Sequence, residues 1–262
     1  MRLNKIATYG MHFWKVIVPA HILGVAALFY LPEHFVSLLV LWFVIGVIGN
    51  GVAAHRYFAH EQFETYSVVR WMLGLLATLG AIAPLSHWMI QHREHHIVAD
   101  SEEDKDSSTN NSMWHIMYEQ RFKSGTDTAF YMRKMRVRRI VVKIRKDPLL
   151  LFLDRHYFTV IHTFSLILLL INPIWCWMYW LAVCIEFFRI GLVNWFGHGD
   201  HIGGYRNHEC SDSSSNNLLV GWLGMGFGWH NNHHADPKRL VLTDHWWEVD
   251  VEGYIGYLLR KR

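Results

Sequence analysis

The sequence is poor in charged residues and in cysteine. Only 18% of its 262 residues are charged, whereas 52% are hydrophobic, and a soluble domain of this size ordinarily carries more charge. The three cysteines form no Cys-x-x-Cys pair, and two of them lie in apolar stretches, which excludes a disulfide framework and a thiolate zinc site. The mean hydropathy of +0.09 is too low for a chain that lies wholly in a membrane. The composition therefore favours a few membrane spans joined to a sizeable polar part.

Four apolar stretches have the length of membrane spans. A helix needs about 20 apolar residues to cross roughly 30 Å of hydrocarbon. The four stretches are residues 13–31, 35–54, 157–171 and 174–193. Only Pro32, Glu33 and His34 separate the first two, and Asn172 and Pro173 separate the last two. The pattern predicts two helical hairpins.

Basic residues indicate the orientation of these spans. Both hairpin turns lack Lys and Arg, whereas residues 56–155 are rich in them. The positive-inside rule then places both termini and the long middle loop on the cytoplasmic side. A shorter apolar stretch, residues 68–85, is broken by glycines and a proline, and we expect it to lie at the membrane interface.

The predicted fold class is an all-α integral membrane protein that crosses the membrane several times. One domain covers residues 1–262, with four transmembrane helices in two hairpins under a cytosolic helical cap formed by residues 55–156 and 194–262. Residues 133–146 contain eight basic side chains and no acid. This segment is expected to contact anionic lipid headgroups or to recruit a phosphate-bearing substrate carrier.

Histidine is the enriched residue, with 19 copies against 22 acids, and it is clustered. The clusters comprise His55 and His60, then His92, His95 and His96, then His230, His233 and His234. Helix positions i, i+3 and i+4 share one face, so each His-x-x-His-His segment is expected to aim three imidazoles at one point. All three clusters fall on the predicted cytoplasmic side, and folding must bring them together.

These histidines predict a metal centre. Imidazole suits iron, copper, zinc and nickel, and eight histidines exceed the needs of one ion, so two metals are the economical solution. The Glu and Glu-x-x-His pattern of soluble di-iron carboxylate bundles is absent, and zinc without redox work rarely needs so many ligands. We expect two iron ions (Fe2+/Fe3+). The alternative is a non-catalytic metal-binding or transport protein, but transport predicts ionisable ligands within the spans.

At these clusters the sequence resembles the membrane-bound fatty acid desaturases, most closely the delta-9 branch of stearoyl-CoA and acyl-lipid desaturases. The matching segments are HRYFAH (55–60), HREHH (92–96) followed by two aspartates, NWFGH (194–198), SSSNNLLVGWLGMGFGWHNNHH (213–234) and HWWEVD (245–250). The resemblance implies a four-helix membrane stem under a cytosolic cap that holds a di-iron centre.

The resemblance also implies which residues form the centre. The implied ligands are His55, His60, His92, His95, His96, His198, His230, His233 and His234, with Asn194 holding a water. His198 belongs to none of the three clusters, but it lies four residues after Asn194 on the same helix face. Asp100, Asp104 and Asp236 are expected to orient ligands. One departure is Phe227, which stands where the branch often has glutamate.

The reaction that the resemblance implies is desaturation. Two electrons from an external carrier, together with dioxygen, would remove two hydrogens from a saturated acyl chain and leave a cis double bond, with delta-9 expected. The metal site supplies the chemistry, and no separate catalytic side chain is expected. A related di-iron hydroxylase is the alternative, although the pair Asn194 and His198 favours the desaturase branch. A tunnel lined by aromatics such as Trp71, Trp88, Tyr57 or Trp195 is expected to select the substrate.

Several partners follow from this reading. The acyl chain would be carried by coenzyme A, acyl carrier protein or a membrane lipid. The electron donor would be of ferredoxin or cytochrome b5 type, with its reductase. The lipid bilayer surrounds the spans, and we expect no nucleic acid among the partners.

Overall fold

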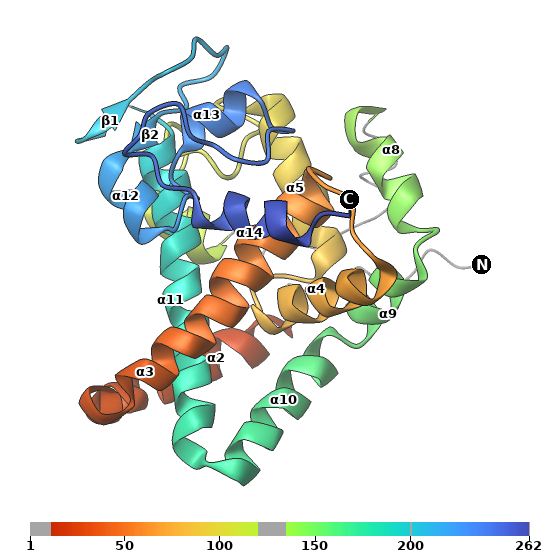
Figure 1. The fold of residues 1–262 in the computed structure, drawn as a ribbon, viewed down its shortest axis with the longest axis vertical. Helices are drawn as coiled ribbons and strands as arrows, with labels where there is room; N and C mark the ends of the chain where they lie inside the picture. The colour runs from red at the N-terminus through yellow and green to blue at the C-terminus, as the bar shows by residue number, and fades with distance from the viewer. Residues whose placement is uncertain (1–11, 120–134, 200, 262) are drawn as a thin grey trace.

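Figure 1 shows the computed structural model, which describes residues 12–119, 135–199 and 201–261. This part of the chain is mostly helical. Two strands of two residues each, β1 (Gly204–Tyr205) and β2 (Asn216–Asn217), pair antiparallel with Gly204 opposite Asn217. The predicted helical class is confirmed apart from this short ribbon.

The N-terminal helices fold back on themselves beside a long later helix. They are α2 (Trp14–Ala27), the 3-10 turn η1 (Leu28–Tyr30), α3 (Leu31–Trp42) and the π-helix η2 (Phe43–Ala59), and they contact α11 (Pro173–Gly197). The Phe13 ring lies 5.5 Å from the Phe187 ring, and Trp42 Nε1 donates to Glu186 Oε1 at 2.7 Å. Because Phe13 and Trp42 reach neighbouring positions of α11, α2 and α3 run antiparallel.

A second reversal joins α10 (Tyr157–Ile171) to α11. The Asn172 side chain accepts the backbone N–H of Ile174 at 3.0 Å, and Pro173 occupies the first position of α11. Both features are typical of a helix start, because a cap satisfies a free N–H and proline has none to satisfy. Trp180 Nε1 donates to Ser165 Oγ at 2.8 Å across the pair.

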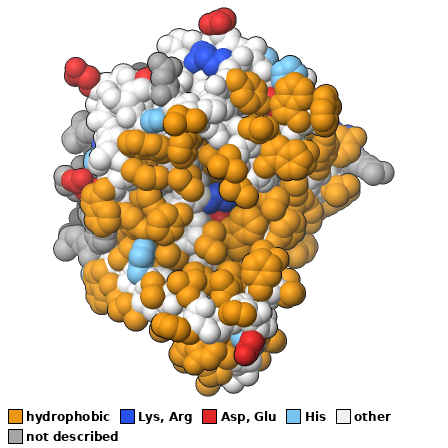
Figure 2. All heavy atoms as spheres, turned by 90° about the vertical axis from the view of Figure 1, so that its left-hand side faces the viewer, with side chains coloured by type: hydrophobic (Ala, Val, Ile, Leu, Met, Phe, Trp, Pro, Cys, Tyr) orange, Lys and Arg blue, Asp and Glu red, His pale blue; other side chains and the backbone are white. Residues whose placement is uncertain are grey.

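Two helical stretches are long and apolar enough to cross a membrane, Trp14–Ala59 and Pro173–Gly197. Ser67–Leu79 and Tyr157–Ile171 are shorter apolar helices. Several large apolar side chains on these helices face outward, with Phe29 85% and Leu170 77% exposed. Figure 2 shows hydrophobic side chains over most of one face of the molecule, with few charged groups among them. Such a surface is typical of a protein that associates with a membrane.

The predicted boundaries differ from the structure at the first hairpin. We expected two spans, residues 13–31 and 35–54, separated by a turn at residues 32–34. The structure assigns helix almost without a break over Trp14–Ala59, with Pro32 in the first turn of α3, where proline is tolerated, although the chain still reverses between α2 and α3. Tyr30, with φ −109° and ψ 4°, and His34, with φ −118° and ψ 18°, leave the helical range there.

The remaining helices gather at the other end of the molecule. They are α4 (Ser67–Leu79), α5 (Leu85–Val98), the π-turn η3 (His115–Glu119), α8 (Met135–Ile144), α9 (Pro148–Arg155), α12 (Leu218–Leu223), α13 (His230–Ala235) and α14 (Val251–Leu259). In Figure 1, α5 and α13 lie together at the top, and α14 crosses η2 below them.

Two hydrophobic clusters support this arrangement. One lies among α2, α3, α10 and α11, and the other lies among η2, α4, α5, α8 and α9. Trp88 on α5 packs against both clusters. Helix α5, which carries three of the predicted site histidines, is therefore held by both.

Candidate metal centre

Nine histidines from η2, α5, α13 and the end of α11 come together in two sets. Set A contains His55, His60, His92, His96 and His233. Set B contains His95, His198, His230 and His234. One ring nitrogen from each of four set A residues lies within 4.8 Å of the others, and set B has the same property. His96 joins set A because its Nε2 is 2.9 Å from His233 Nε2.

Within each set the rings point their Nε2 atoms at one another. The Nε2–Nε2 distances are 3.0 Å for His55–His233, 2.6 Å for His60–His92, 3.1 Å for His95–His198 and 3.0 Å for His198–His230. Nitrogen atoms that surround a common ion adopt this arrangement.

The proton positions in set B indicate what lies between the rings. His95 Nδ1 is 3.0 Å from both oxygens of Asp104, and His198 Nδ1 is 3.1 Å from Asp100 Oδ1. A carboxylate accepts a hydrogen bond, so we assign the proton of each ring to Nδ1. The two Nε2 atoms then face each other at 3.1 Å, a contact that either a proton on His95 or a shared cation would stabilise. The donor set therefore fits a metal ion that prefers imidazole, such as iron, copper or zinc.

The surroundings keep most of these rings neutral, as metal ligands must be. Burial lowers the pKa of His92, His96 and His233 well below the usual histidine value, and neighbouring imidazoles lower it further. Burial also lowers the pKa of His234 to about 4. His95 differs, because the hydrogen bond and charge of Asp104 outweigh burial and raise its pKa.

The two His-x-x-His-His helices do not act as we expected. In α5, His95 at i+3 belongs to set B and the other two rings belong to set A. In α13, His233 at i+3 belongs to set A and the other two belong to set B. The expectation that each segment aims three imidazoles at one point is wrong. Viewed down the axis of an α-helix, residue i+3 lies about 60° to one side of residue i, and residue i+4 lies about 40° to the other side. The rings at i+3 and i+4 therefore point in different directions.

The first pair of histidines depends on a π-helix. The structure continues the helix through Ala59, whereas we expected the second span to end at Ala54. His60 N donates to His55 O at 3.0 Å, an i→i+5 bond that defines a π-turn. This turn brings two residues that are five apart onto one side, with ring centroids separated by 4.9 Å. The spacing of HRYFAH therefore matches π-helical geometry.

Buried asparagines hold the short helix α13 in place. Asn216 Oδ1 accepts the backbone N–H groups of Asn231 at 2.9 Å and Asn232 at 3.2 Å. Asn232 Nδ2 donates to Glu248 Oε2 at 3.0 Å. All three asparagines are 0% exposed. The residues between His230 and His233 therefore fasten the helix, a role that histidine spacing alone did not indicate.

Three aspartates contact set B. Asp100 and Asp104 do so as expected, but Asp236 is exposed and accepts the backbone N–H of Lys238 at 3.1 Å. The third partner is Asp212, whose Oδ2 lies 2.9 Å from His234 Nδ1. Asp212 lies just before the SSSNN segment, and no spacing rule singled it out.

Asn194 lies on α11, four residues before His198, and is 9% exposed. Its Nδ2 is 3.4 Å from Asp106 Oδ1. Asp106 in turn lies within a group with His95 and Asp104. The structure therefore places Asn194 beside the acidic loop that supports set B, and its proposed water stays a prediction.

Phe227 occupies the position where the resembled branch often has glutamate. Its ring centroid is 4.7 Å from that of His55, and the Arg189 guanidinium lies 4.9 Å from the ring centroid of Phe227. Arg189 pairs with Glu186 at 2.9 Å and Glu252 at 2.7 Å. An aromatic ring therefore separates set A from a buried ion-pair network.

The aromatic residues expected along a tunnel have different surroundings. Trp88 stacks on the set A residue His92, with 5.4 Å between centroids and 7° between planes. Trp71 packs on Phe152, and Trp195 packs on His201. Tyr57 packs on Phe58 and Phe63. Trp88 is therefore the candidate with direct contact to a site histidine.

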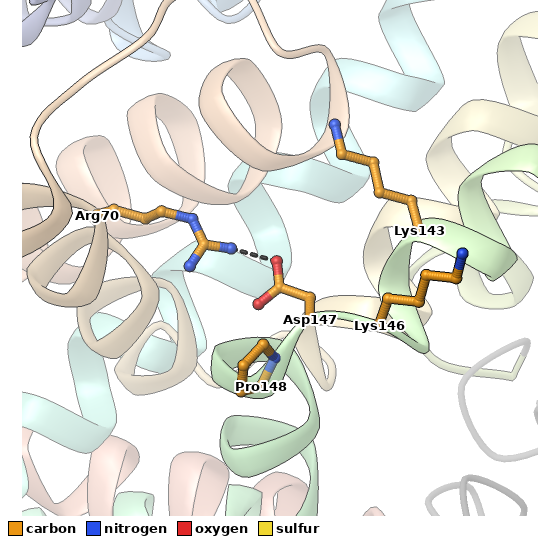
Figure 3. Close-up of a pocket in the computed structure, with 5 residues that line it drawn as sticks. All are labelled: Arg70, Lys143, Lys146, Asp147 and Pro148. Atoms are coloured by element: carbon orange, nitrogen blue, oxygen red, sulfur yellow. Dashed lines mark hydrogen bonds and ion pairs between the residues drawn. The ribbon is translucent and has the colours of Figure 1, made fainter.

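The basic segment forms α8 in its described part, and Arg133 and Lys134 lie outside the described residues. Val137, Val141 and Ile144 are buried against the second hydrophobic cluster. The exposed basic side chains in its described part are Arg138, Arg139, Lys143, Arg145 and Lys146. Figure 3 shows a pocket at its end, where Arg70 of α4 bonds Asp147 with Lys143 and Lys146 nearby.

The fold and site define a class of protein, a mostly helical chain with apolar surface helices and two buried histidine sets that could hold metal. A family model described as fatty acid desaturase matches residues 34–250, and the chain belongs to this family. The resemblance seen in the sequence is confirmed. The protein is an oxidoreductase that inserts a double bond into an acyl chain.

Curated relatives support this membership. The chain is 30% identical over 249 residues to the sn-1 stearoyl-lipid 9-desaturase of Anabaena variabilis, which covers 91% of this chain and 87% of the relative. It is 29% identical over 244 residues to the icosanoyl-CoA 5-desaturase of Limnanthes douglasii, and this match covers 90% of this chain and 65% of the relative. It is 28% identical over 261 residues to the delta-9 acyl-lipid desaturase 1 of Arabidopsis thaliana, and this match covers 97% of this chain and 78% of the relative.

Proposed function

We propose that the chain is a di-iron acyl-lipid desaturase that forms a cis double bond at the delta-9 position. The observation that carries this proposal is the pair of histidine sets with facing Nε2 atoms. The names of two of the relatives support a lipid-linked chain and the 9-position. Coenzyme A and acyl carrier protein are the other possible carriers, and one relative is named as acting on an acyl-CoA at the 5-position.

The nine histidines of sets A and B would hold two iron ions, with Asn194 holding a water. Iron bound there would supply the reductive activation of dioxygen. Asp100, Asp104 and Asp212 would keep the set B rings in the tautomer that offers Nε2 to the metal. Most of the site rings are buried, so they exclude bulk water from the reacting carbons.

The reaction needs an external reductant. Loss of two hydrogens from adjacent methylenes, with two electrons and two protons from outside, reduces one dioxygen to two waters. The electrons would come from a carrier of ferredoxin or cytochrome b5 type with its reductase. The acyl chain would lie beside the metals, and Trp88, which stacks on His92, would guide it.

The proposed membrane topology follows the two reversals of the chain. Residues 13–31, 35–54, 157–171 and 174–193 would form four spans within a single domain of residues 1–262. Residues 55–156 and 194–262 would form the cap, with both termini and the site on the cytoplasmic side. The antiparallel packing of α2 and α3 beside α11 supports this arrangement.

The test is product analysis in a host that supplies an electron donor. Fatty acids from cells that express the chain would be analysed by gas chromatography and mass spectrometry, with the lipid classes separated first and the double bond located by derivatisation. We expect a monounsaturated acid with its double bond at carbon 9, first in a membrane lipid. The variant His233→Ala should make none, because it removes a set A ring.

A matched control is His208→Ala. His208 pairs with Asp244 at 2.6 Å, outside both sets, and its side chain is 38% exposed. This variant should keep the wild-type product. A hydroxy acid in place of the alkene would move the chain to the hydroxylases, and a product that persists in His233→Ala would overturn the site.

A further inference from the structure

The two histidine sets differ in what stands behind their rings. In set B, the Nδ1 atoms of His95 and His234 are hydrogen-bonded to carboxylates, and that of His198 lies near a third carboxylate without the geometry of a hydrogen bond. The Nδ1–oxygen distances are 3.0 Å for His95–Asp104, 3.1 Å for His198–Asp100 and 2.9 Å for His234–Asp212. Three carboxylates therefore stand directly behind set B.

Set A has a different environment. The Nδ1 atoms of His55, His60 and His233 are buried and have no hydrogen-bond partner among the residues that the structure describes. The nearby guanidinium of Arg56 is paired with Asp250 at 2.8 Å and so adds little net charge. A metal cation in set A would thus lie among rings of which three have no Nδ1 partner in the described part of the chain.

The difference has a direct effect on metal binding. A carboxylate that accepts from Nδ1 fixes the ring and makes Nε2 a stronger donor, and loss of one such partner typically costs about 10- to 100-fold in metal affinity. Three carboxylates also compensate the charge of a divalent ion, whereas a buried uncompensated charge is costly. Set A has one more imidazole, but in set B two rings are hydrogen-bonded to carboxylates and a third lies 3.1 Å from one.

We infer that the two metal positions are unequal, with set B as the tight position that fills first and set A as the weak position that empties first. Asp100, Asp104 and Asp212 are the positioning residues that create the difference. The inference rests on the proposed two-metal function, and it concerns metal retention rather than turnover.

The test measures iron retention by the full chain in detergent. The protein would be loaded anaerobically with Fe2+, dialysed against increasing concentrations of an iron chelator, and analysed for iron per chain by mass spectrometry. The wild type should lose one iron first and retain the second to a chelator concentration at least about 10-fold higher. This measurement needs no variant, so a folding defect cannot obscure it.

Two conservative variants then identify the tight position. Asp104→Asn and Asp212→Asn keep the shape of the side chain and remove its charge. Each should move the second loss about 10-fold lower in chelator concentration, toward that of the first loss, without changing the concentration at which set A loses its iron. Asp236→Asn is the matched control, because Asp236 is exposed and bonds Lys238 instead of a histidine. It should match the wild type.

Three results would overturn the inference. They are loss of both irons in a single step from the wild type, a shift of only the first step in the aspartate variants, or no shift in either step. A wild type that desaturates lipid yet loses both irons together refutes only this inference. A wild type that holds fewer than two irons and makes no unsaturated product refutes the proposed function itself.

Discussion

Gly197, the last residue of α11, has no room for a side chain. A Cβ placed there would lie 2.6 Å from Cδ2 and 2.8 Å from Cγ of His230, whereas non-bonded carbons lie about 3.5 to 4.0 Å apart. In Gly197→Ala the imidazole must therefore move by about 1 Å. A displacement of this size in a positioned group can cost about 100-fold in rate. We expect desaturation to fall by about that factor.

The same change should not unfold the helix. Gly197 ends α11 without a positive φ, and alanine in a helix is favoured over glycine by up to about 1 kcal/mol. Activity should therefore fall while the melting temperature in detergent stays near that of the wild type. The assay is the ratio of monounsaturated to saturated acid in cells, paired with thermal melting of the purified chain.

The control for this prediction is Gly74→Ala. A Cβ at Gly74 would lie 2.8 Å from the flexible end of the Leu153 side chain, which can move without disturbing a site histidine. This variant should keep wild-type product levels. Normal desaturation by Gly197→Ala, with iron content unchanged, would show that His230 does not need its observed position, and the reasoning would fail.

Two further changes test other parts of the structure. Asp250→Ala removes the nearest carboxylate from the fully buried Arg56 guanidinium, 2.8 Å away, while Glu252 stays 3.6 Å from Arg56 Nε, so the free energy of unfolding should fall by about 3 kcal/mol. A melting temperature equal to that of the wild type would contradict this. Asn194→Ala should reduce desaturation without abolishing it and leave the iron content intact, because a water can be held imperfectly. Full activity would remove Asn194 from the site.

Much of the architecture could be predicted from residue patterns. The apolar stretches and the three histidine clusters indicated a mostly helical membrane-associated metalloprotein, because burial and imidazole chemistry depend on residue type. His198 required the family resemblance. A single histidine after an apolar helix has no spacing that distinguishes it from a structural residue.

Other features depend on tertiary contacts that no local pattern contains. The division of each His-x-x-His-His segment between two sets arises because α5 and α13 face each other, so the i+3 ring of each helix reaches the set of the other. The extension of η2 to Ala59 uses an i→i+5 bond whose stability depends on its buried surroundings. Asp212 contacts His234 although the two residues are 22 positions apart in the chain. No local sequence pattern indicates such a contact.

Each histidine set takes rings from both α5 and α13, and this has a consequence for the synthesis of the protein. Set A lacks His233 and set B lacks both His230 and His234 until the last part of the chain has been synthesised and docked. Neither metal position can be completed by the earlier segments alone. A nascent or truncated chain therefore lacks a complete histidine set, and under the proposed function both metal positions would be completed only in a chain that has folded through to α13.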